Sequence, residues 1–190
     1  LAWTRGVLEA GGEAALAALA GTGDSGGAVF VPHLAGVGTP DHLGAARGAL
    51  VGLTLGHDRA AVARAVYEGI ACETRLILDG MEAGGPIGRL VLAGGVSGGA
   101  LIPRLLADLT GRTLAVRQVT DASLLGAAAL AWVGAGRFPD VPTAARSFAL
   151  EAAEHVLEPG SPDAGAALYR RYLAAVETLL TAGWNRGEDA

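Results

Sequence analysis

A glycine-rich stretch has the composition and position of a ligand-binding loop. It follows the short apolar run 90–93 and precedes a helical pattern, and it consists of Gly94, Gly95, Val96, Ser97, Gly98 and Gly99. Glycines lack Cβ atoms, so a ligand can approach the backbone, and free N–H groups at a helix start suit an anion or the sugar and α-phosphate of a nucleotide. Similar turns also occur without a ligand, so local chemistry leaves both interpretations open.

Two familiar phosphate-binding loops do not describe this stretch. Residues 94–99 lack the G-x-G-x-x-G spacing, and the chain has no lysine to complete a G-x-x-x-x-G-K-[ST] loop. No acidic residue is well placed after a first strand to bind a ribose. A fragment of a dinucleotide-dependent oxidoreductase is therefore a weak interpretation.

Composition limits the class of protein. The 190 residues are 51% hydrophobic, enough for one buried α/β core, and no apolar run approaches the roughly 18 residues of a membrane helix. The net charge is −5 and all 14 basic residues are scattered arginines, which argues against nucleic-acid binding. Cys72 is the only cysteine, so an internal disulfide is excluded and a cytoplasmic location is expected. The N-terminal residues look like the middle of a longer chain.

Apolar periodicity predicts alternating strands and helices, hence an α/β layer architecture. Strands are expected at 28–32, 48–54, 90–93 and 113–119. Helices are expected as two short segments within 1–19, a long one beginning at the cap Asp58, and others at 101–109, at 121–132, between 142 and 160, and at 166–180. Gly111 should end the 101–109 helix. We expect one domain over residues 1–160, with residues 161–190 forming a helix packed on it and a frayed end.

The long loop 33–47 holds polar candidates, because long loops inside compact domains are often functional. They are His33, Thr39, Asp41, His42 and Arg47. A histidine here could be a ligand or a base, but no second metal-type residue stands at a fixed spacing, so a structural role is favoured.

Three further features have a structural and a functional interpretation. Trp3 could stack on a ligand, although an aromatic residue on an apolar helix face is more often core. Glu68 and Glu73 could be catalytic carboxylates, but on an arginine-rich helix a solvated face is favoured. The small residues at 126–128 favour close packing of a helix on a sheet.

Taken together, these stretches resemble the C-terminal domain of the FGGY family of carbohydrate kinases. Residues 47–69 resemble the second family signature, residues 92–100 the adenosine motif, and residues 106–111 the helix that follows it. Residues 30–40 and 120–131 resemble the flanking motifs, and the similarity extends from residue 1 to about 176. This resemblance implies a ribonuclease H-like fold of the actin and hexokinase type, with a mixed sheet flanked by helices.

The resemblance also implies an activity. Family members transfer the γ-phosphoryl group of ATP, with Mg²⁺, to a hydroxyl of a sugar or polyol in a cleft between two domains, and dimers are common among them. Gly94 and Gly95 would contact ribose and α-phosphate through the backbone, while Val96, Ser97, Gly98 and Gly99 would shape the adenine pocket. The base Asp would lie upstream, in an N-terminal domain absent from these residues, so the chain alone should be inactive. A pentulose such as xylulose is the expected substrate, with glycerol or another polyol as the second choice.

Departures from the family pattern support an alternative. A polar residue is usual where Ala61 stands, Val37 and Gly38 replace Glu and Arg, and Gly99 replaces an adenine-contacting Asn of the glycerol-kinase type. Pro103 and Arg104 also replace polar residues. The chain could therefore belong to a non-catalytic, nucleotide-binding or regulatory relative.

Overall fold

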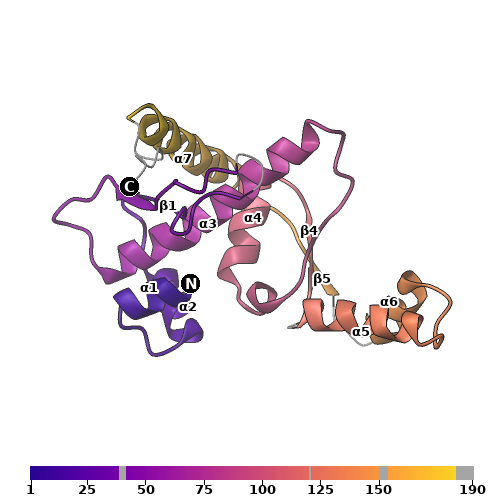
Figure 1. Ribbon diagram of the computed structural model, residues 1–190. Coiled ribbons are helices and arrows are strands. Elements are labelled where there is room, and N and C mark those ends of the chain that lie inside the picture. Colours follow the sequence, from indigo (N-terminus) through magenta and orange to yellow (C-terminus); the bar gives the residue numbers. More distant parts are fainter. Residues whose placement is uncertain (39–41, 120, 150–153, 183–190) are drawn as a thin grey trace.

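The computed structural model describes residues 1–38, 42–119, 121–149 and 154–182, without the side chains of Val96, Phe148 and Ala149 (Figure 1). Its helices are α1 (Ala2–Val7), α2 (Glu13–Thr22), α3 (Arg59–Glu82), α4 (Leu101–Thr110), α5 (Ala122–Gly134), α6 (Val141–Ala149) and α7 (Pro162–Thr181), with a 3₁₀ turn at Gly95–Gly98. Its strands are β1 (Val29–Val31), β2 (Ala49–Val51), β3 (Leu90–Leu92), β4 (Leu114–Arg117) and β5 (Glu154–Leu157). The predicted α/β class is confirmed.

The strands form two small sheets. Strands β1 and β2 pair antiparallel, whereas β3, β4 and β5 form a mixed sheet in that order. In this second sheet β3 runs parallel to β4, with Leu90 opposite Leu114, because helix α4 carries the chain back between them. Strand β5 runs antiparallel to β4. The turn between β3 and α4 therefore lies at the carboxyl end of a parallel strand, where ligands bind in open α/β sheets.

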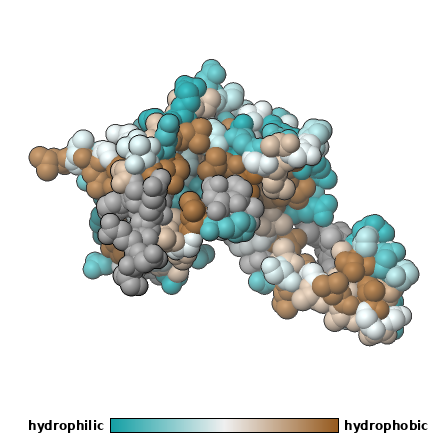
Figure 2. Space-filling view, turned by 45° about the horizontal axis from the view of Figure 1, so that its top comes forward, coloured by the Kyte–Doolittle hydropathy of each residue, from teal (hydrophilic) through white to brown (hydrophobic). Residues whose placement is uncertain are grey.

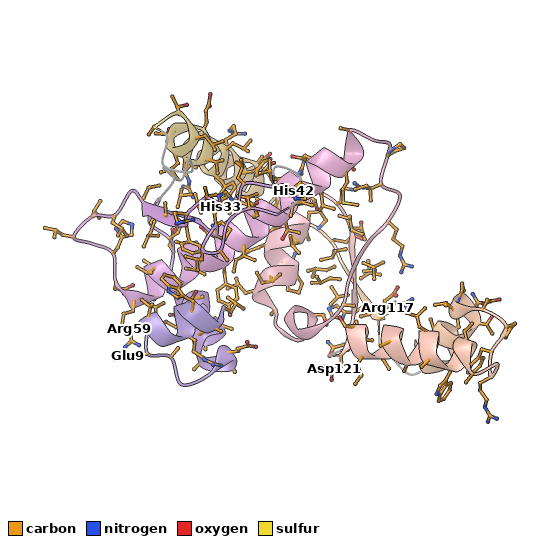
Figure 3. The ribbon with its side chains drawn as sticks, viewed as in Figure 1. Glu9, His33, His42, Arg59, Arg117 and Asp121 are labelled. Carbon is orange, nitrogen blue, oxygen red and sulfur yellow. The ribbon has the colours of Figure 1, made fainter. Side chains whose placement is uncertain are left out.

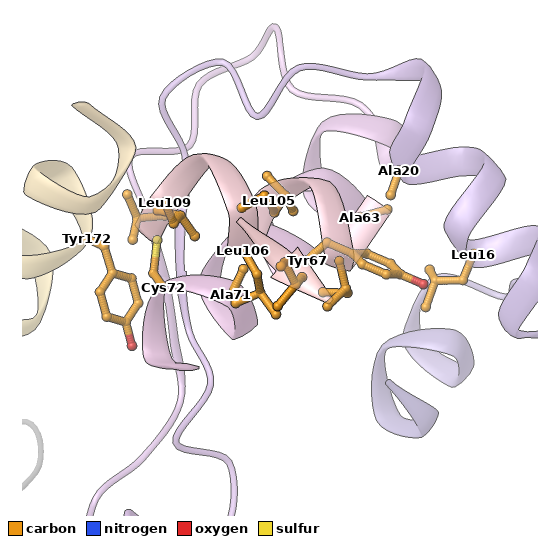
Figure 4. Close-up of a cluster of buried hydrophobic side chains, with 14 of the residues drawn as sticks. Leu16, Ala20, Ala63, Tyr67, Ala71, Cys72, Leu105, Leu106, Leu109 and Tyr172 are labelled. Carbon is orange, nitrogen blue, oxygen red and sulfur yellow. The ribbon is translucent and has the colours of Figure 1, made fainter. Parts of the chain in front are cut away.

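Helix α3 is the central element and crosses the middle of the molecule (Figure 1). Its start was correctly predicted: the carboxylate of Asp58 accepts a hydrogen bond from the Ala61 N–H at 2.9 Å. The main core forms where α3 meets α2, α4 and α7. Figure 4 shows its two ends, with Leu16 near Tyr67 at one end and Tyr172 beside Cys72 at the other.

Two glycines let helices approach other segments at backbone distance. A Cβ on Gly69 of α3 would lie 2.0 Å from the Phe30 carbonyl oxygen in β1. A Cβ on Gly165 of α7 would lie 2.2 Å from the Asp108 carbonyl oxygen in α4. No side chain fits at such distances, so both contacts require glycine.

Several sequence expectations are wrong. Strand β5 was missed, since four residues between a helix and a turn carry little periodic signal. Trp3 is half exposed and stacks on Phe30 with ring centroids 6.2 Å apart, so it is not core. The small residues Gly126 and Ala127 are exposed instead of packed on the sheet. Residues 185–190, expected to fray, lie outside the described residues.

Helices α5 and α6 form a hairpin that lies apart from the other helices (Figure 1). Helix α5 is apolar on every side, yet Ala129 is its only buried residue. Leu124 and Leu130 are 68% and 63% exposed. The apolar surface of this hairpin is visible at the lower right of Figure 2. A helix that is apolar all round is normally covered, so α5 has the composition of a helix that packs against further structure.

The Gly69 contact gives the first prediction. Gly69→Ala should destabilise the chain by about 3 kcal/mol, because α3 must move away from β1 to remove the clash. Gly126→Ala, in a helix with open space around the added methyl group, should be neutral or stabilise slightly. Urea denaturation of both variants checks this. Equal stabilities would show that α3 and β1 are not in close contact.

Candidate nucleotide-binding groove

The glycine loop connects β3 to α4 and has a defined backbone. Gly94 adopts φ of +93°, a conformation that side chains rarely allow. Its N–H donates to the Val119 carbonyl at 2.7 Å, which ties the loop to the end of β4. The buried Ser97 donates both its N–H, at 3.0 Å, and its hydroxyl, at 2.7 Å, to the Gly94 carbonyl. Ser97 therefore holds the turn and does not present its hydroxyl to a ligand.

The remaining glycines of the loop leave its outer surface open. Added Cβ atoms at Gly95, Gly98 and Gly99 would meet nothing within 4 Å, and all three residues are exposed. Gly99 has an extended backbone with φ of −97° and ψ of 154°, which any residue can adopt. Its lack of a side chain therefore leaves room beside the loop and is not required by the backbone conformation. The loop thus offers bare, exposed backbone to a ligand.

Two cavities border this loop. One, of about 670 Å³, lies toward β4 and β5 and is lined by Gly98, Gly99, Gln118 and His155 among others. The other, of about 400 Å³, lies toward α2 and α3 and is lined by Gly95, Glu13, Ala14 and Tyr67 among others. Gly98, Gly99, Ala17 and Leu101 belong to both, so the two cavities form one groove across the loop. Volumes of this order are typical of small-molecule sites.

The groove has donors at its base and apolar walls. Helix α4 begins at Leu101 without a side-chain cap, and because Pro103 has no N–H, the backbone donors at its start are those of Leu101 and Ile102. Arg104 lines the groove as well, and its guanidinium donates to the Glu158 carbonyl at 2.7 Å, which holds the side chain in place. The walls include Leu101 and Ile102 on one side and Ala14 and Ala17 on the other. Such a groove can hold a flat apolar ring with a polar or anionic group near the helix start.

Of the predicted loop residues, Gly95, Ser97, Gly98 and Gly99 line the groove, whereas Gly94 does not, and the sequence missed the opposite wall. Ala14 and Ala17 come from a helix that carries no motif, and Tyr67 lies in the signature stretch 47–69, far from the loop in sequence, so only the tertiary structure brings them to the loop. The side chain of Val96 lies outside the described residues. Gly21, Gly23 and Gly26 do have G-x-G-x-x-G spacing, but they follow helix α2 and precede β1. That order is the reverse of the strand, loop and helix of a dinucleotide-binding turn.

The two carboxylates of α3 are not on a solvated face, contrary to the sequence prediction. Glu68 is 8% exposed and pairs with Arg64 at 2.7 Å. Glu73 accepts a hydrogen bond from the Tyr172 hydroxyl, and its Oε2 lies 3.3 Å from Nε2 of the buried His33. Helix α7 and the segment after β1 cover this side of α3, which the periodicity of α3 alone could not indicate.

Burial and hydrogen bonding shift the pKa values in this cluster. Burial raises the pKa of Glu73, but the neighbouring His33 and the Tyr172 hydroxyl lower it, and the net shift is below its ordinary value. Burial and then the Glu73 carboxylate raise the pKa of Tyr172. Burial raises the pKa of the Cys72 thiol to about 12, so this thiol is unreactive. The cluster is structural and is not part of the groove.

The loop candidates do not form a second site. Thr39 and Asp41 lie outside the described residues. His33 and His42 both lie on the segment after β1 (Figure 3), but His33 is buried and His42 is exposed. Arg47 donates to the carbonyls of Ala45 and Ala46 at 2.9 and 3.0 Å. Among the described residues no three His, Cys, Asp or Glu side chains are grouped to hold a metal ion.

The fold is an α/β domain with a groove at the carboxyl end of a parallel strand. Residues 4–135 match the C-terminal domain of the FGGY family of carbohydrate kinases, so the chain belongs to that family. It is 41% identical over 143 residues to a glycerol kinase of Gloeobacter violaceus, covering 73% of this chain and 29% of that protein. It is 36% identical over 177 residues to a glycerol kinase of Bordetella parapertussis, covering 92% of this chain and 33% of that protein. The chain therefore spans about a third of the curated relatives it matches.

Solved structures agree with this assignment. A xylulose kinase from Rhodospirillum rubrum matches with a TM-score of 0.74 and 25% identity, over 94% of this chain and 37% of that one. The fold of a Plasmodium falciparum glycerol kinase solved with ADP matches with a TM-score of 0.74 and 21% identity, over 94% of this chain and 36% of that one. The predicted actin- and hexokinase-type fold is thus confirmed. No helix in the described residues is long and apolar enough to cross a membrane.

The Glu73 cluster gives the second prediction. Because the folded-state pKa of Glu73 is lowered, its ionised form stabilises the fold above the ordinary pKa of 4.5, and this contribution is lost as pH falls through the folded-state value. Glu73→Gln should therefore cost about 1–3 kcal/mol at pH 7 and progressively less below about pH 5. Urea denaturation between pH 3.5 and 7, with the exposed Glu177→Gln as control, measures this difference. A penalty independent of pH would refute the ionic role.

Proposed function

We propose that this chain is the ATP-binding wall of a carbohydrate kinase, which transfers the γ-phosphoryl group of ATP to a hydroxyl of a sugar or polyol. The observation that carries the proposal is the open glycine loop at the start of α4, between two cavities. Membership of the FGGY family and the fold match to a kinase solved with ADP support it. The nucleotide would lie across Gly98 and Gly99, with its ring between Ala17 and Leu101 and its ribose and α-phosphate at Gly94 and Gly95.

The remaining parts of the reaction would come from outside this chain. Phosphoryl transfer needs positioning, charge stabilisation and a carboxylate to accept the hydroxyl proton. The carboxylates Glu68 and Glu73 are engaged away from the groove, so a base from the upstream part of the polypeptide is proposed. Mg²⁺ supplies charge neutralisation in this chemistry. The described residues offer no cluster to hold it, so the phosphates and upstream residues would bind it.

Glycerol or a related polyol is the proposed acceptor. Curated relatives at 36–41% identity are named glycerol kinase, whereas the xylulose kinase from R. rubrum shares 25% identity. These comparisons do not support the sequence-based preference for a pentulose. A non-catalytic relative remains the alternative, because Val37, Gly38, Ala61 and Gly99 depart from the family pattern.

The exposed surface of α5 supports an upstream domain that packs on this chain. The apolar α5 is uncovered, and β3 is an edge strand whose Val91 is half exposed. Edge strands with free backbone groups normally pair or are covered. The relatives are about three times as long as this chain, so further polypeptide is the proposed cover.

A coupled ADP-release assay on the complete gene product tests the activity. With Mg-ATP, glycerol should give the highest rate among glycerol, xylulose, ribulose and gluconate, and the 190-residue chain alone should give none. A higher rate with xylulose would overturn the acceptor but not the kinase. Nucleotide binding without turnover of any acceptor would favour the non-catalytic relative.

A substitution at Gly99 tests the groove. Gly99→Val fits the extended backbone and clashes with nothing, but its side chain enters both cavities. In the complete gene product it should raise the KM for ATP at least about tenfold, a loss of about 1.4 kcal/mol, with unchanged thermal stability. The control is Gly88→Val, at another exposed loop glycine with open surroundings. An unchanged KM for ATP in Gly99→Val would place the nucleotide elsewhere.

A charged residue introduced on α5 tests whether the upstream polypeptide buries this helix. Leu124→Glu should leave the stability of the 190-residue chain nearly unchanged, because the side chain is exposed there. In the complete gene product the same change should cost about 2 kcal/mol or more, since a charge would then be buried. Thermal denaturation of both lengths gives the comparison, with exposed Glu177→Gln as control. Equal effects at both lengths would mean that nothing upstream covers Leu124.

A further inference from the structure

The two cavities of the groove differ in the polar side chains that line them. The cavity toward β4 and β5 includes Arg104, Gln118 and His155. The cavity toward α2 and α3 is otherwise apolar, and among the described residues its polar side chains are those of Glu13 and Tyr67. A polar group of a ligand at this end of the groove must therefore meet Glu13, Tyr67 or the backbone of the glycine loop.

The hydroxyl group of Tyr67 is held in place but unpaired. The residue is 4% exposed, so packing fixes its ring, which extends from α3 toward Leu16 of α2 (Figure 4). Its hydroxyl makes no hydrogen bond with the described residues. In this part of the chain the unpaired side-chain atoms that are fully enclosed belong to Ser25, His33 and Glu68, so the Tyr67 oxygen keeps some accessible surface. Because Tyr67 lines the groove, a ligand there can reach this oxygen.

Glu13 brings a negative charge close to this hydroxyl. It is the first residue of α2, and its side chain is exposed. Burial raises the pKa of Tyr67, and the Glu13 carboxylate raises it further, so the two groups lie near each other. The carboxylate makes no hydrogen bond or ion pair with the residues that the structure describes. One end of the groove therefore offers an unpaired acceptor beside an unpaired hydroxyl.

This pair of groups limits the ligand chemistry that it can bind. An ionised carboxylate only accepts hydrogen bonds, so Glu13 repels a phosphate group and attracts hydroxyl or amine groups. The Tyr67 hydroxyl can both donate and accept. Two adjacent hydroxyl groups of a sugar match this combination, because one can donate to the carboxylate while its neighbour pairs with the phenol.

The position of the pair along the groove indicates which sugar this is. Gly95 lines the same cavity as Glu13 and Tyr67 and does not line the other cavity, whereas Gly98 and Gly99 line both. With the ring of a nucleotide across Gly98 and Gly99 and its ribose at Gly95, the ribose lies in the cavity that Glu13 and Tyr67 line.

We propose that Glu13 and Tyr67 bind the 2′- and 3′-hydroxyl groups of this ribose and make the groove selective for ribonucleotides. One hydroxyl donates to the Glu13 carboxylate, and the other exchanges a hydrogen bond with the Tyr67 phenol. Both residues determine specificity, and neither contacts the transferred phosphoryl group. The selectivity rests on the proposed function, because it requires a nucleotide in the groove.

Calorimetric titration of the complete gene product with ADP, 2′-deoxy-ADP and 3′-deoxy-ADP tests this selectivity without any need for turnover. The unmodified protein should bind ADP about tenfold or more tightly than at least one deoxy form, because a site built to bind a hydroxyl rejects the analogue that lacks it. ADP binding without preference for the ribose would overturn this inference alone. A complete absence of ADP binding would refute the proposed function as well, so the two failures are distinguishable.

Two substitutions identify the groups responsible. Glu13→Ala and Tyr67→Phe should each weaken ADP binding about tenfold, with little effect on the deoxy form that lacks the hydroxyl in question. The matched control is Asp163→Ala, which removes an exposed acid from the first turn of α7, away from both cavities, and should leave ADP binding unchanged. If Tyr67→Phe fails to fold, the exposed Glu13→Ala still decides. Equal weakening of all three nucleotides by Glu13→Ala would mean that its carboxylate contacts the base, and this result, or no weakening at all, would overturn the proposal.

Discussion

The fold depends on the backbone contact between α3 and β1 at Gly69. Helix α3 can lie directly on Phe30 only because position 69 has no Cβ. That approach fixes the distance between the first sheet and the helical core, since α2, α4 and α7 all pack on the remaining surfaces of α3. Gly165 allows the same kind of close backbone contact between α7 and α4.

Position on α3 also decides what its polar residues do. The groove includes Tyr67, whereas Glu68 lines a separate polar cavity bordered by α4 and α7, and Glu73 lies beneath α7. Residues only a few positions apart therefore serve three different environments, because each successive side chain points about 100° further around a helix. Two of the three environments include polar atoms that are buried by segments distant in the sequence. Helix α3 thus holds polar groups in separate environments on its different sides, while its apolar residues contact the neighbouring helices.

Much of the fold could be predicted from the sequence, because periodicity and capping are local. The Asp58 cap, the left-handed Gly111 at the end of α4 and the strand, loop and helix around Gly94 were all found where the pattern placed them. The loop residues of the groove were identified by composition alone. The environments of Glu68, Glu73 and Trp3 could not be predicted, since they depend on which distant element covers α3 and α1. The exposure of α5 was missed for the same reason: its composition indicates burial, yet among the described residues Ala129 is its only buried residue.

The apolar helix α5 has a consequence for synthesis. Chains leave the ribosome from the N-terminus, so a domain upstream of Leu1 would be complete, or nearly so, before α5 emerges. The covering surface would then already be folded when α5 forms. The apolar side chains around Leu124 and Leu130 would be buried soon after they leave the ribosome. Expressed without that domain, the same helix would remain open to neighbouring chains. With the proposed domain upstream, the order of the two parts along the polypeptide would thus protect the exposed apolar helix α5.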